Sequence, residues 1–175
     1  MLCLIDDGDL RPTAPRIAAR AGVSLRSIFQ HFSDLEALFA AAAKRELERL
    51  SALVGPLPLA ACLDDRLDAF VAQRARVLEA VTPVRRASLL QEPSSAELRS
   101  SRVGLLALAR AEVAEVFGRE LESRPRADRT ELLDALDAAS SWQTWEALRA
   151  HQGLSPPRAR RVMRRMLSAL LDERN

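Results

Sequence analysis

The chain has little of several residue types, and each shortage excludes a class of protein. Its 175 residues include no tyrosine, two cysteines and two histidines. Cys3 and Cys62 have no CxxC or Cys/His spacing, so we expect both to pack as buried apolar side chains rather than to form a disulfide or a metal site. His31 and His151 lie far apart, and no glycine-rich phosphate loop is present. We therefore expect no metal, no cofactor and no enzymatic activity.

β-Branched residues are also scarce, since 17 valines, isoleucines and threonines stand against 29 leucines and 30 alanines. This composition favours helices and predicts an all-α fold. Nine prolines, six glycines and a hydrophobic content of 48% exclude a disordered chain. Lys44 is the one lysine among 26 basic residues, a preference for arginine that we interpret as a GC-rich coding bias.

Long apolar runs are absent as well. Acidic residues follow the first five positions, at Asp6 and Asp7, before any segment long enough for a signal peptide, and no later run approaches a membrane span. The sequence therefore predicts a cytoplasmic protein with no membrane partner.

Capping residues divide the N-terminal part into three expected helices. The first runs from Thr13 or Ala14 to Ala21 and ends at Gly22, and Ser24 caps a second that ends at Phe32. Ser33 is expected to cap the third, as the start of a capping box, and this helix continues to about Leu53. We assign residues 1–47 to a helix-turn-helix domain and residues 48–175 to a helical ligand-binding and dimerisation domain.

Helical periodicity continues through the second domain. We expect a helix from Asp64 or Asp65 to Ala80, stopped by Pro83, and a short one from there to Gln91. The later helices are expected over 94–122, 128–151 and 155–173.

The last two expected helices carry apolar stripes at helical spacing. These stripes can close the core of one subunit or pair with a second copy in a four-helix interface. The residues assigned to a dimer interface are Leu132, Leu136, Ala139, Val162, Met163, Met166 and Leu170. The opposite face of the last helix is rich in arginine, which we interpret as a solvated face in preference to a nucleic-acid patch.

The formal net charge of +2 conceals a basic segment near the N-terminus. No acidic residue lies between Leu10 and Ser33, and this stretch contains Arg11, Arg16, Arg20 and Arg26. Gly22 permits a left-handed turn between two short helices, as in a helix-turn-helix. The apolar residues expected to pack the two helices together are Ile17, Ala18, Ala21, Val23 and Ile28. The second helix is then free to enter a major groove of DNA.

The motif Ile17-Ala-Ala-Arg-Ala-Gly-Val-Ser24, followed by Ile28-Phe-Gln-His-Phe32 and Glu36-Ala-Leu-Phe39, resembles the DNA-binding domain of the TetR family of one-component transcriptional regulators. The resemblance covers about residues 8–47. It implies a double-stranded DNA partner, with Thr13 directed to a phosphate and Arg26, Ser27 and Gln30 at base-reading positions. The full set of implied DNA-binding residues is Thr13, Ser24, Leu25, Arg26, Ser27, Phe29, Gln30 and His31. His31 either supports a backbone contact or packs between helices.

Three positions depart from the family pattern. Phe29 replaces a tyrosine, so its phosphate-directed hydroxyl is lost and the ring is expected only to pack. Leu35 replaces a lysine that clamps a phosphate, which lowers the expected salt dependence of binding. The family's first helix is longer than Met1 to Asp7 allows, which implies either a start further upstream or a weakened domain.

The resemblance implies a homodimeric repressor that binds a palindromic operator and is released by a small-molecule effector. Candidate pocket residues are Phe70, Arg74, Phe117 and Trp142, although core packing explains each of them equally well. The alternative is a helical ligand-binding or protein-interaction module with a degenerate DNA-binding head. Absence of saturable binding to the DNA upstream of its own gene would favour that alternative.

Overall fold

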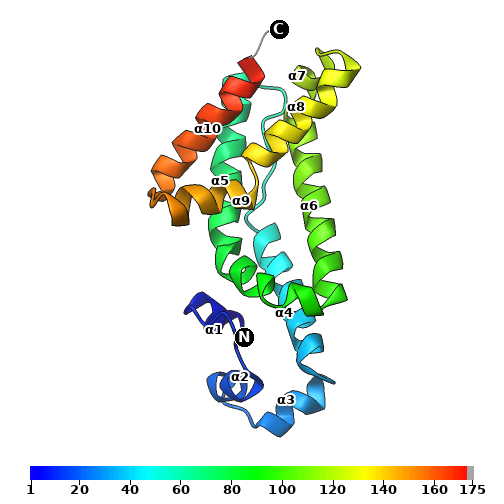
Figure 1. Cartoon of the computed structure of the whole chain (residues 1–175), viewed down its shortest axis with the longest axis vertical. Helices are drawn as coiled ribbons and strands as arrows, with labels where there is room; N and C mark the ends of the chain where they lie inside the picture. Colours follow the sequence, from blue (N-terminus) through cyan, green and yellow to red (C-terminus); the bar gives the residue numbers. More distant parts are fainter. Residues whose placement is uncertain (173–175) are drawn as a thin grey trace. The chain divides into compact units, whose positions relative to one another are not determined.

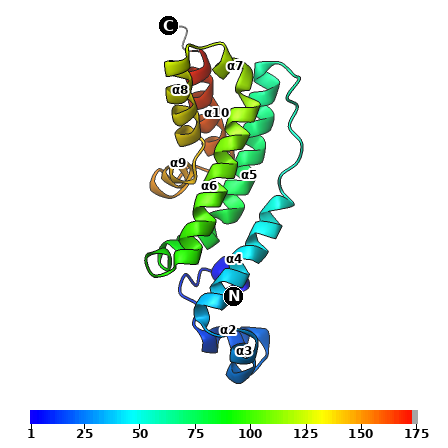
Figure 2. The same cartoon turned by 90° about the vertical axis from the view of Figure 1, so that its right-hand side faces the viewer.

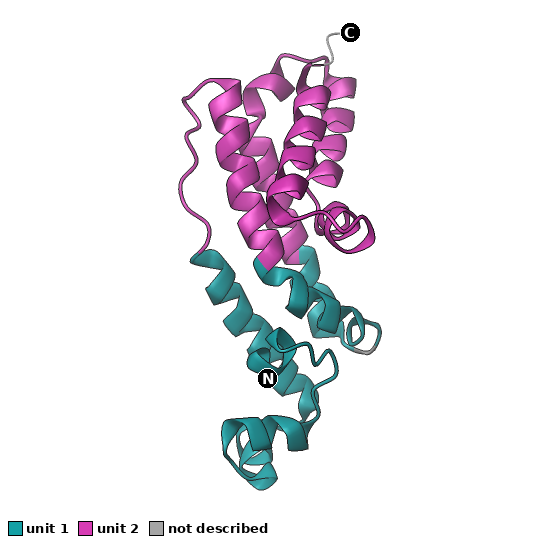
Figure 3. Cartoon of the chain, turned by 90° about the vertical axis from the view of Figure 1, so that its left-hand side faces the viewer, with its two compact units in different colours: residues 1–52, 80–103 teal, residues 53–79, 104–175 magenta. Residues whose placement is uncertain are grey.

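The computed structural model describes residues 1–172, and every regular element in that range is a helix (Figures 1 and 2). The chain divides into two compact units (Figure 3). Unit 1 combines residues 1–52 with 80–103, and unit 2 combines residues 53–79 with the chain from 104 onward. The all-α prediction is confirmed. The domain boundary that we placed after residue 47 falls inside a helix and remains a prediction.

Unit 1 begins with three short helices and one long one. These are α1 (Leu2–Asp6), α2 (Ala14–Ala21), α3 (Leu25–His31) and α4 (Leu35–Ser51). The end of α5 (Leu63–Leu89), the short 3₁₀ helix η1 (Glu92–Ser94) and the start of α6 (Ala96–Val116) complete the unit. The ranges expected for α2, α3 and α4 are confirmed to within two residues.

A small apolar core holds the first four helices together. Its buried members are Ile17, Ala18, Ile28 and Leu38, with Met1, Leu4 and Phe32 packed against them. Two residues that we expected in this core lie outside it, because Ala21 is exposed and Val23 keeps 43% of its surface exposed. Both flank Gly22, where the chain turns away from the core.

The cap of α4 also differs from the expectation. Asp34, not Ser33, is the N-cap, and its Oδ1 accepts a hydrogen bond from the Ala37 N–H at 2.8 Å. The Ser33 hydroxyl donates to the Asp34 carboxylate at 3.2 Å instead. A carboxylate at this position also complements the positive end of the helix dipole.

Unit 2 surrounds the larger core. Besides its parts of α5 and α6, it contains α7 (Gly118–Glu122), α8 (Arg126–Ala139), α9 (Trp142–Glu146), a π-helical turn η2 (Ala147–His151) and α10 (Pro156–Asp172). Helices α8 and α10 pack side by side (Figure 1). The side chains of Phe70, Phe117, Leu136, Trp145 and Met163 are among those buried at the centre.

Three predicted helix boundaries are wrong. Helix α5 continues through Pro83, because the buried side chains of Leu78 and Ala87 on either side hold the helix despite the missing N–H. The helix expected over 94–122 breaks at Phe117. The helix expected over 128–151 breaks after Ala139, where the Ser141 side chain caps α9 by accepting from the Thr144 N–H. The predicted end of the last helix, Glu173, lies outside the described residues.

Both cysteines are free thiols, but the prediction that they are buried is wrong, since Cys3 and Cys62 are exposed. Within residues 1–172, no cluster of three or more histidine, cysteine or acidic side chains is arranged to hold a metal ion. No helix in the same range is long and apolar enough to cross a membrane.

The Arg49 guanidinium links three helices of unit 1, namely α1, α4 and α5. Arg49 of α4 donates to both carboxylate oxygens of Asp6, at 2.9 and 3.4 Å, and to the buried Glu46 at 3.0 Å. It also reaches the carbonyl oxygen of Ala80 in α5, at 3.5 Å. Burial raises the pKa of Glu46, although the hydrogen bond and the charge of Arg49 act in the opposite direction.

We expect Glu46 to make the stability of the chain depend on pH. Its carboxyl pKa is higher in the folded than in the unfolded chain, so the folded chain takes up the proton first and the unfolding free energy rises as the pH falls from neutral toward the ordinary carboxyl range. Glu46→Gln removes this contribution, while Arg49 keeps its bonds to Asp6. Urea unfolding of both proteins at several pH values measures the difference. An equal pH dependence of the two would contradict the assignment.

Candidate nucleic-acid interface and effector residues

Helices α2 and α3 form the expected helix-turn-helix. Gly22 ends α2 with φ +68°, a left-handed conformation that lets the Gly22 and Val23 N–H groups bond the carbonyls of Ala19 and Ala18. The chain then enters α3 through Ser24, whose Oγ accepts from the Ser27 N–H at 3.0 Å. The turn and the cap together fix the direction of α3.

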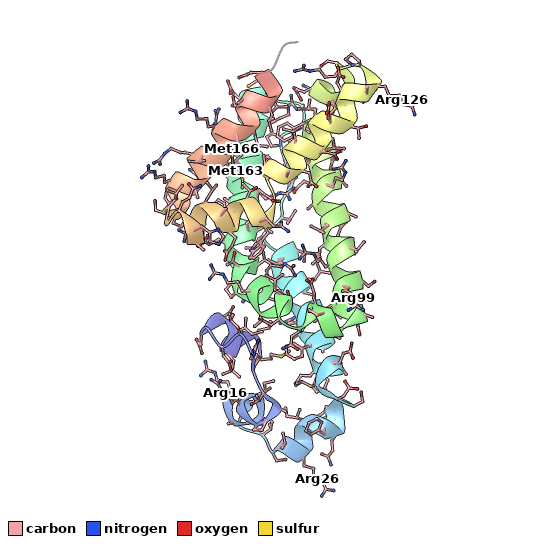
Figure 4. All side chains as sticks on the ribbon, viewed as in Figure 1. Arg16, Arg26, Arg99, Arg126, Met163 and Met166 are labelled. Atoms are coloured by element: carbon pink, nitrogen blue, oxygen red, sulfur yellow. The ribbon has the colours of Figure 1, made fainter. Side chains whose placement is uncertain are left out.

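The outer face of α3 carries the predicted base-reading residues. Leu25, Arg26, Phe29 and Gln30 are exposed, while Ile28 points into the core. Arg26 and Gln30 stand one turn apart and therefore share a side of the helix. The Arg26 side chain extends away from the ribbon (Figure 4), and within residues 1–172 no acidic side chain lies within ion-pair distance of it.

The other predicted DNA-binding residues lie around the same module. Thr13 is exposed at the N-cap of α2, where its side chain makes no capping hydrogen bond. His31 is exposed at the end of α3, which disfavours the helix-packing alternative. Phe29 does not pack inside the chain as its departure from tyrosine suggested, because 48% of its surface is exposed. Ser27 is half-buried.

The basic segment is less positive than the sequence suggests. Arg16 Nη1 lies 2.9 Å from an Asp9 carboxylate oxygen, and Arg20 Nη2 lies 2.9 Å from one of Asp7. Both acidic residues precede the acid-free stretch, so counting charges within that stretch missed them. Of the predicted cations, Arg26 is the one aligned with the exposed face of α3.

Comparison with known families agrees with this geometry. Residues 4–42 match the family described as bacterial regulatory proteins, tetR family, a range that begins in α1 and includes the whole helix-turn-helix. Residues 4–42 thus carry a TetR-type DNA-binding region, and this match supports a TetR-type transcriptional regulator. No curated protein and no solved structure gives a significant match to the chain.

Three of the four candidate effector residues of this TetR-type regulator meet in unit 2. The rings of Phe70 and Phe117 form an edge-to-face pair with centroids 5.2 Å apart, and the Arg74 guanidinium lies 4.8 Å from the Phe70 centroid. All three side chains are buried, whereas Trp142 is half-buried against the same core. An apolar cavity of about 40 Å³ lies instead in unit 1, lined by residues that include Ile5, Phe39 and Leu98.

Arg74 belongs to a polar network that sequence reasoning missed. Its Nη2 donates to the Glu112 carboxylate at 2.8 Å and to the Ala109 carbonyl oxygen at 2.9 Å, while its buried Nε has no partner. Gln73 donates to the other Glu112 oxygen at 2.7 Å and accepts from the Gly55 N–H at 2.8 Å. Burial lowers the pKa of Arg74, and the charge of Glu112 opposes that shift.

The predicted dimer residues fall into two groups. Leu136 and Met163 are fully buried in the core of unit 2, so they close the core of one chain and are not available to a partner. The others lie half-buried at the edge of that core, namely Leu132, Ala139, Val162, Met166 and Leu170. On α10, the buried row 159, 163, 167, 171 faces inward, and the row 162, 166, 170 runs beside it.

We expect Gly22 to be required for the turn. A Cβ at Gly22 meets no atom within 4 Å, so Gly22→Ala costs only the left-handed backbone conformation, about 1–2 kcal/mol of unfolding free energy. Gly104→Ala is the matched control, because Gly104 lies inside α6 in equally open space and the change should stabilise by roughly 0.5–1 kcal/mol. Urea unfolding measures both. Effects of the same sign would refute the assignment.

Proposed function

We propose that this TetR-type regulator is a repressor that binds a roughly palindromic operator as a homodimer and is released by a small-molecule effector. The observation that carries the proposal is the exposed face of α3, on which Arg26 has no acidic partner and Gln30 stands one turn away. An arginine of this kind can bond guanine in a bidentate manner, and a glutamine can bond adenine.

The surroundings of α3 fit the same role. Leu25 and Phe29 expose apolar surface beside Arg26, and apolar side chains contact the methyl group of thymine in the major groove. Thr13, with its hydroxyl outside the capping bonds, suits a phosphate contact that sets the register of the module. Leu35 is exposed at the start of α4 and supplies no cation there. Base contacts should therefore contribute a large share of the specific affinity.

A dimer is needed to place two recognition helices in successive major grooves, about 34–36 Å apart. We assign the interface to the half-buried edge of α8 and α10, formed by Leu132, Ala139, Val162, Met166 and Leu170. These side chains continue the apolar core to the surface of unit 2, so a second copy packed against them would extend the core.

The effector site is assigned to the group around Phe70, Arg74 and Phe117, with Trp142 at its edge. Arg74 supports this assignment, because its buried Nε–H has no partner and can donate a hydrogen bond to a ligand. The network from Arg74 through Glu112 and Gln73 ends at Gly55, four residues after the last residue of α4. A ligand that displaces Glu112 would therefore affect, through Gln73, the segment that follows α4 in the sequence. A coupling free energy of about 1–3 kcal/mol is enough to change DNA affinity 5- to 150-fold.

We expect Arg26→Ala to abolish most of the specific affinity. Loss of one bidentate base contact costs about 1–3 kcal/mol, roughly a 5- to 150-fold weaker operator complex. Fluorescence anisotropy with the DNA upstream of its own gene measures this, and Arg126→Ala is the control because Arg126 is exposed on α8 (Figure 4). Equal binding by the Arg26 variant and the wild type would refute the role of Arg26. Absence of saturable binding by the wild type would favour the degenerate-head alternative.

We expect Met166→Asp to convert the dimer into monomers, since it places a charge in the middle of the proposed apolar interface. Arg161→Asp is the control, because Arg161 is exposed on the same helix and lies on the side away from the row 162, 166, 170. Size-exclusion chromatography with light scattering gives the mass of each protein. A wild type that is monomeric, or a Met166 variant that stays dimeric, would exclude this interface.

A further inference from the structure

A short acidic turn separates the first two helices. We define it as residues 6–9, which contain Asp6, Asp7 and Asp9. Each of these carboxylates lies beside an arginine of another helix of unit 1, with Asp6 against α4 and Asp7 and Asp9 against α2. The turn is thus a group of negative charges within the chain itself, next to α2, the first helix of the DNA-binding motif.

The two pairs with α2 differ from the pair with α4. The Asp9 side chain is held in place, because it is only 11% exposed and its Oδ1 accepts from the Arg11 N–H at 3.1 Å. Its partner Arg16 is 60% exposed and lies 2.9 Å from Oδ2, an oxygen that makes no hydrogen bond of normal geometry. Arg16 is therefore held there by charge, without a hydrogen bond of normal geometry.

The Asp7 pair is open to solvent on both sides. Arg20 donates to the Asp7 carboxylate at 2.9 Å, and both side chains are more than half exposed. An ion pair of this kind contributes little to stability. A DNA phosphate is also a negatively charged hydrogen-bond acceptor, so the Asp7 carboxylate and the phosphate compete for the Arg20 guanidinium.

We propose that Asp7 and Asp9 act as internal competitors of DNA phosphates for Arg20 and Arg16, and so hold down the sequence-independent part of DNA affinity. The inference rests on the proposed binding of DNA by α2 and α3. In the free protein the two carboxylates neutralise the α2 arginines, which leaves the unpaired Arg26 on the base-reading face. Contact of Arg16 or Arg20 with a phosphate first requires the loss of an internal pair.

The test measures binding of the full-length chain to duplexes of unrelated sequence by fluorescence anisotropy, at salt concentrations from about 50 to 200 mM. Asp7→Asn should tighten this binding about two- to five-fold, the range that an exposed ion pair covers. The slope of log K against log salt should become steeper by up to about 0.9, because one more cation reaches a phosphate. Asp9→Asn should act in the same direction and keeps an acceptor for the Arg11 N–H.

Two controls separate competition from a general change of net charge. Asp7→Asn is repeated in an Arg20→Ala background, where no arginine is left to release and the gain should disappear. Asp128→Asn changes the net charge equally at an exposed site in the first turn of α8 and should leave binding unchanged. Circular dichroism checks that each variant is folded.

A gain that persists without Arg20, a comparable gain from Asp128→Asn, or an unchanged affinity and salt slope in both the Asp7 and Asp9 variants would overturn the inference while DNA binding itself stands. Absence of DNA binding by the wild type and every variant would overturn the proposed function and this inference with it.

Discussion

The arrangement of unit 1 depends on the guanidinium of Arg49. Helix α1 has five residues, of which Ile5 is buried and Leu4 packs against the small core, and so short a helix is marginal by itself. The two bonds from Arg49 to Asp6 join the end of α1 to α4, and further contacts with Glu46 and the Ala80 carbonyl fix the guanidinium from two other directions. Because Asp7 and Asp9 lie within three residues of Asp6, the bonds from Arg49 to Asp6 also fix where the acidic turn begins and thus where its carboxylates meet α2.

In unit 2, arginine side chains also join helices, but there the guanidinium groups are buried. The core of this unit is apolar, but the buried Arg66 forms a two-pronged pair with Glu120 and also donates to the carbonyl of Val116. Arg74 similarly shares its donors between Glu112 and a main-chain carbonyl. A buried charge is costly unless it is paired and hydrogen-bonded, so these partners cannot be lost singly without a penalty. Disturbing Glu112 leaves a buried cation without its counter-ion, which is the physical reason for proposing the Arg74 network as the route of coupling.

Local signals predicted the helix-turn-helix because Gly22 and Ser24 act through bonds within a few residues of themselves. Features that depend on distant packing were missed. Proline is a helix breaker in isolation, yet α5 passes through Pro83 because buried residues on either side hold it. Charge counting within one stretch missed Asp7 and Asp9, which lie just outside it. The sequence offers Phe70, Arg74 and Phe117 as pocket candidates that core packing explains equally well, and their contacts with one another and the link to Gly55 exist only in three dimensions.

The preference for arginine over lysine has a structural use that coding bias alone does not convey. Arg49, Arg66 and Arg74 each bond more than one acceptor, which the flat fork of a guanidinium allows and a single ammonium group matches poorly. Arg149 likewise joins both oxygens of Glu79 to the carbonyl of Leu154. Arg26 differs from these four arginines, because its side chain extends away from the ribbon (Figure 4) and meets no acid in the described chain. The same geometry that elsewhere locks helices together is left open there for an external partner.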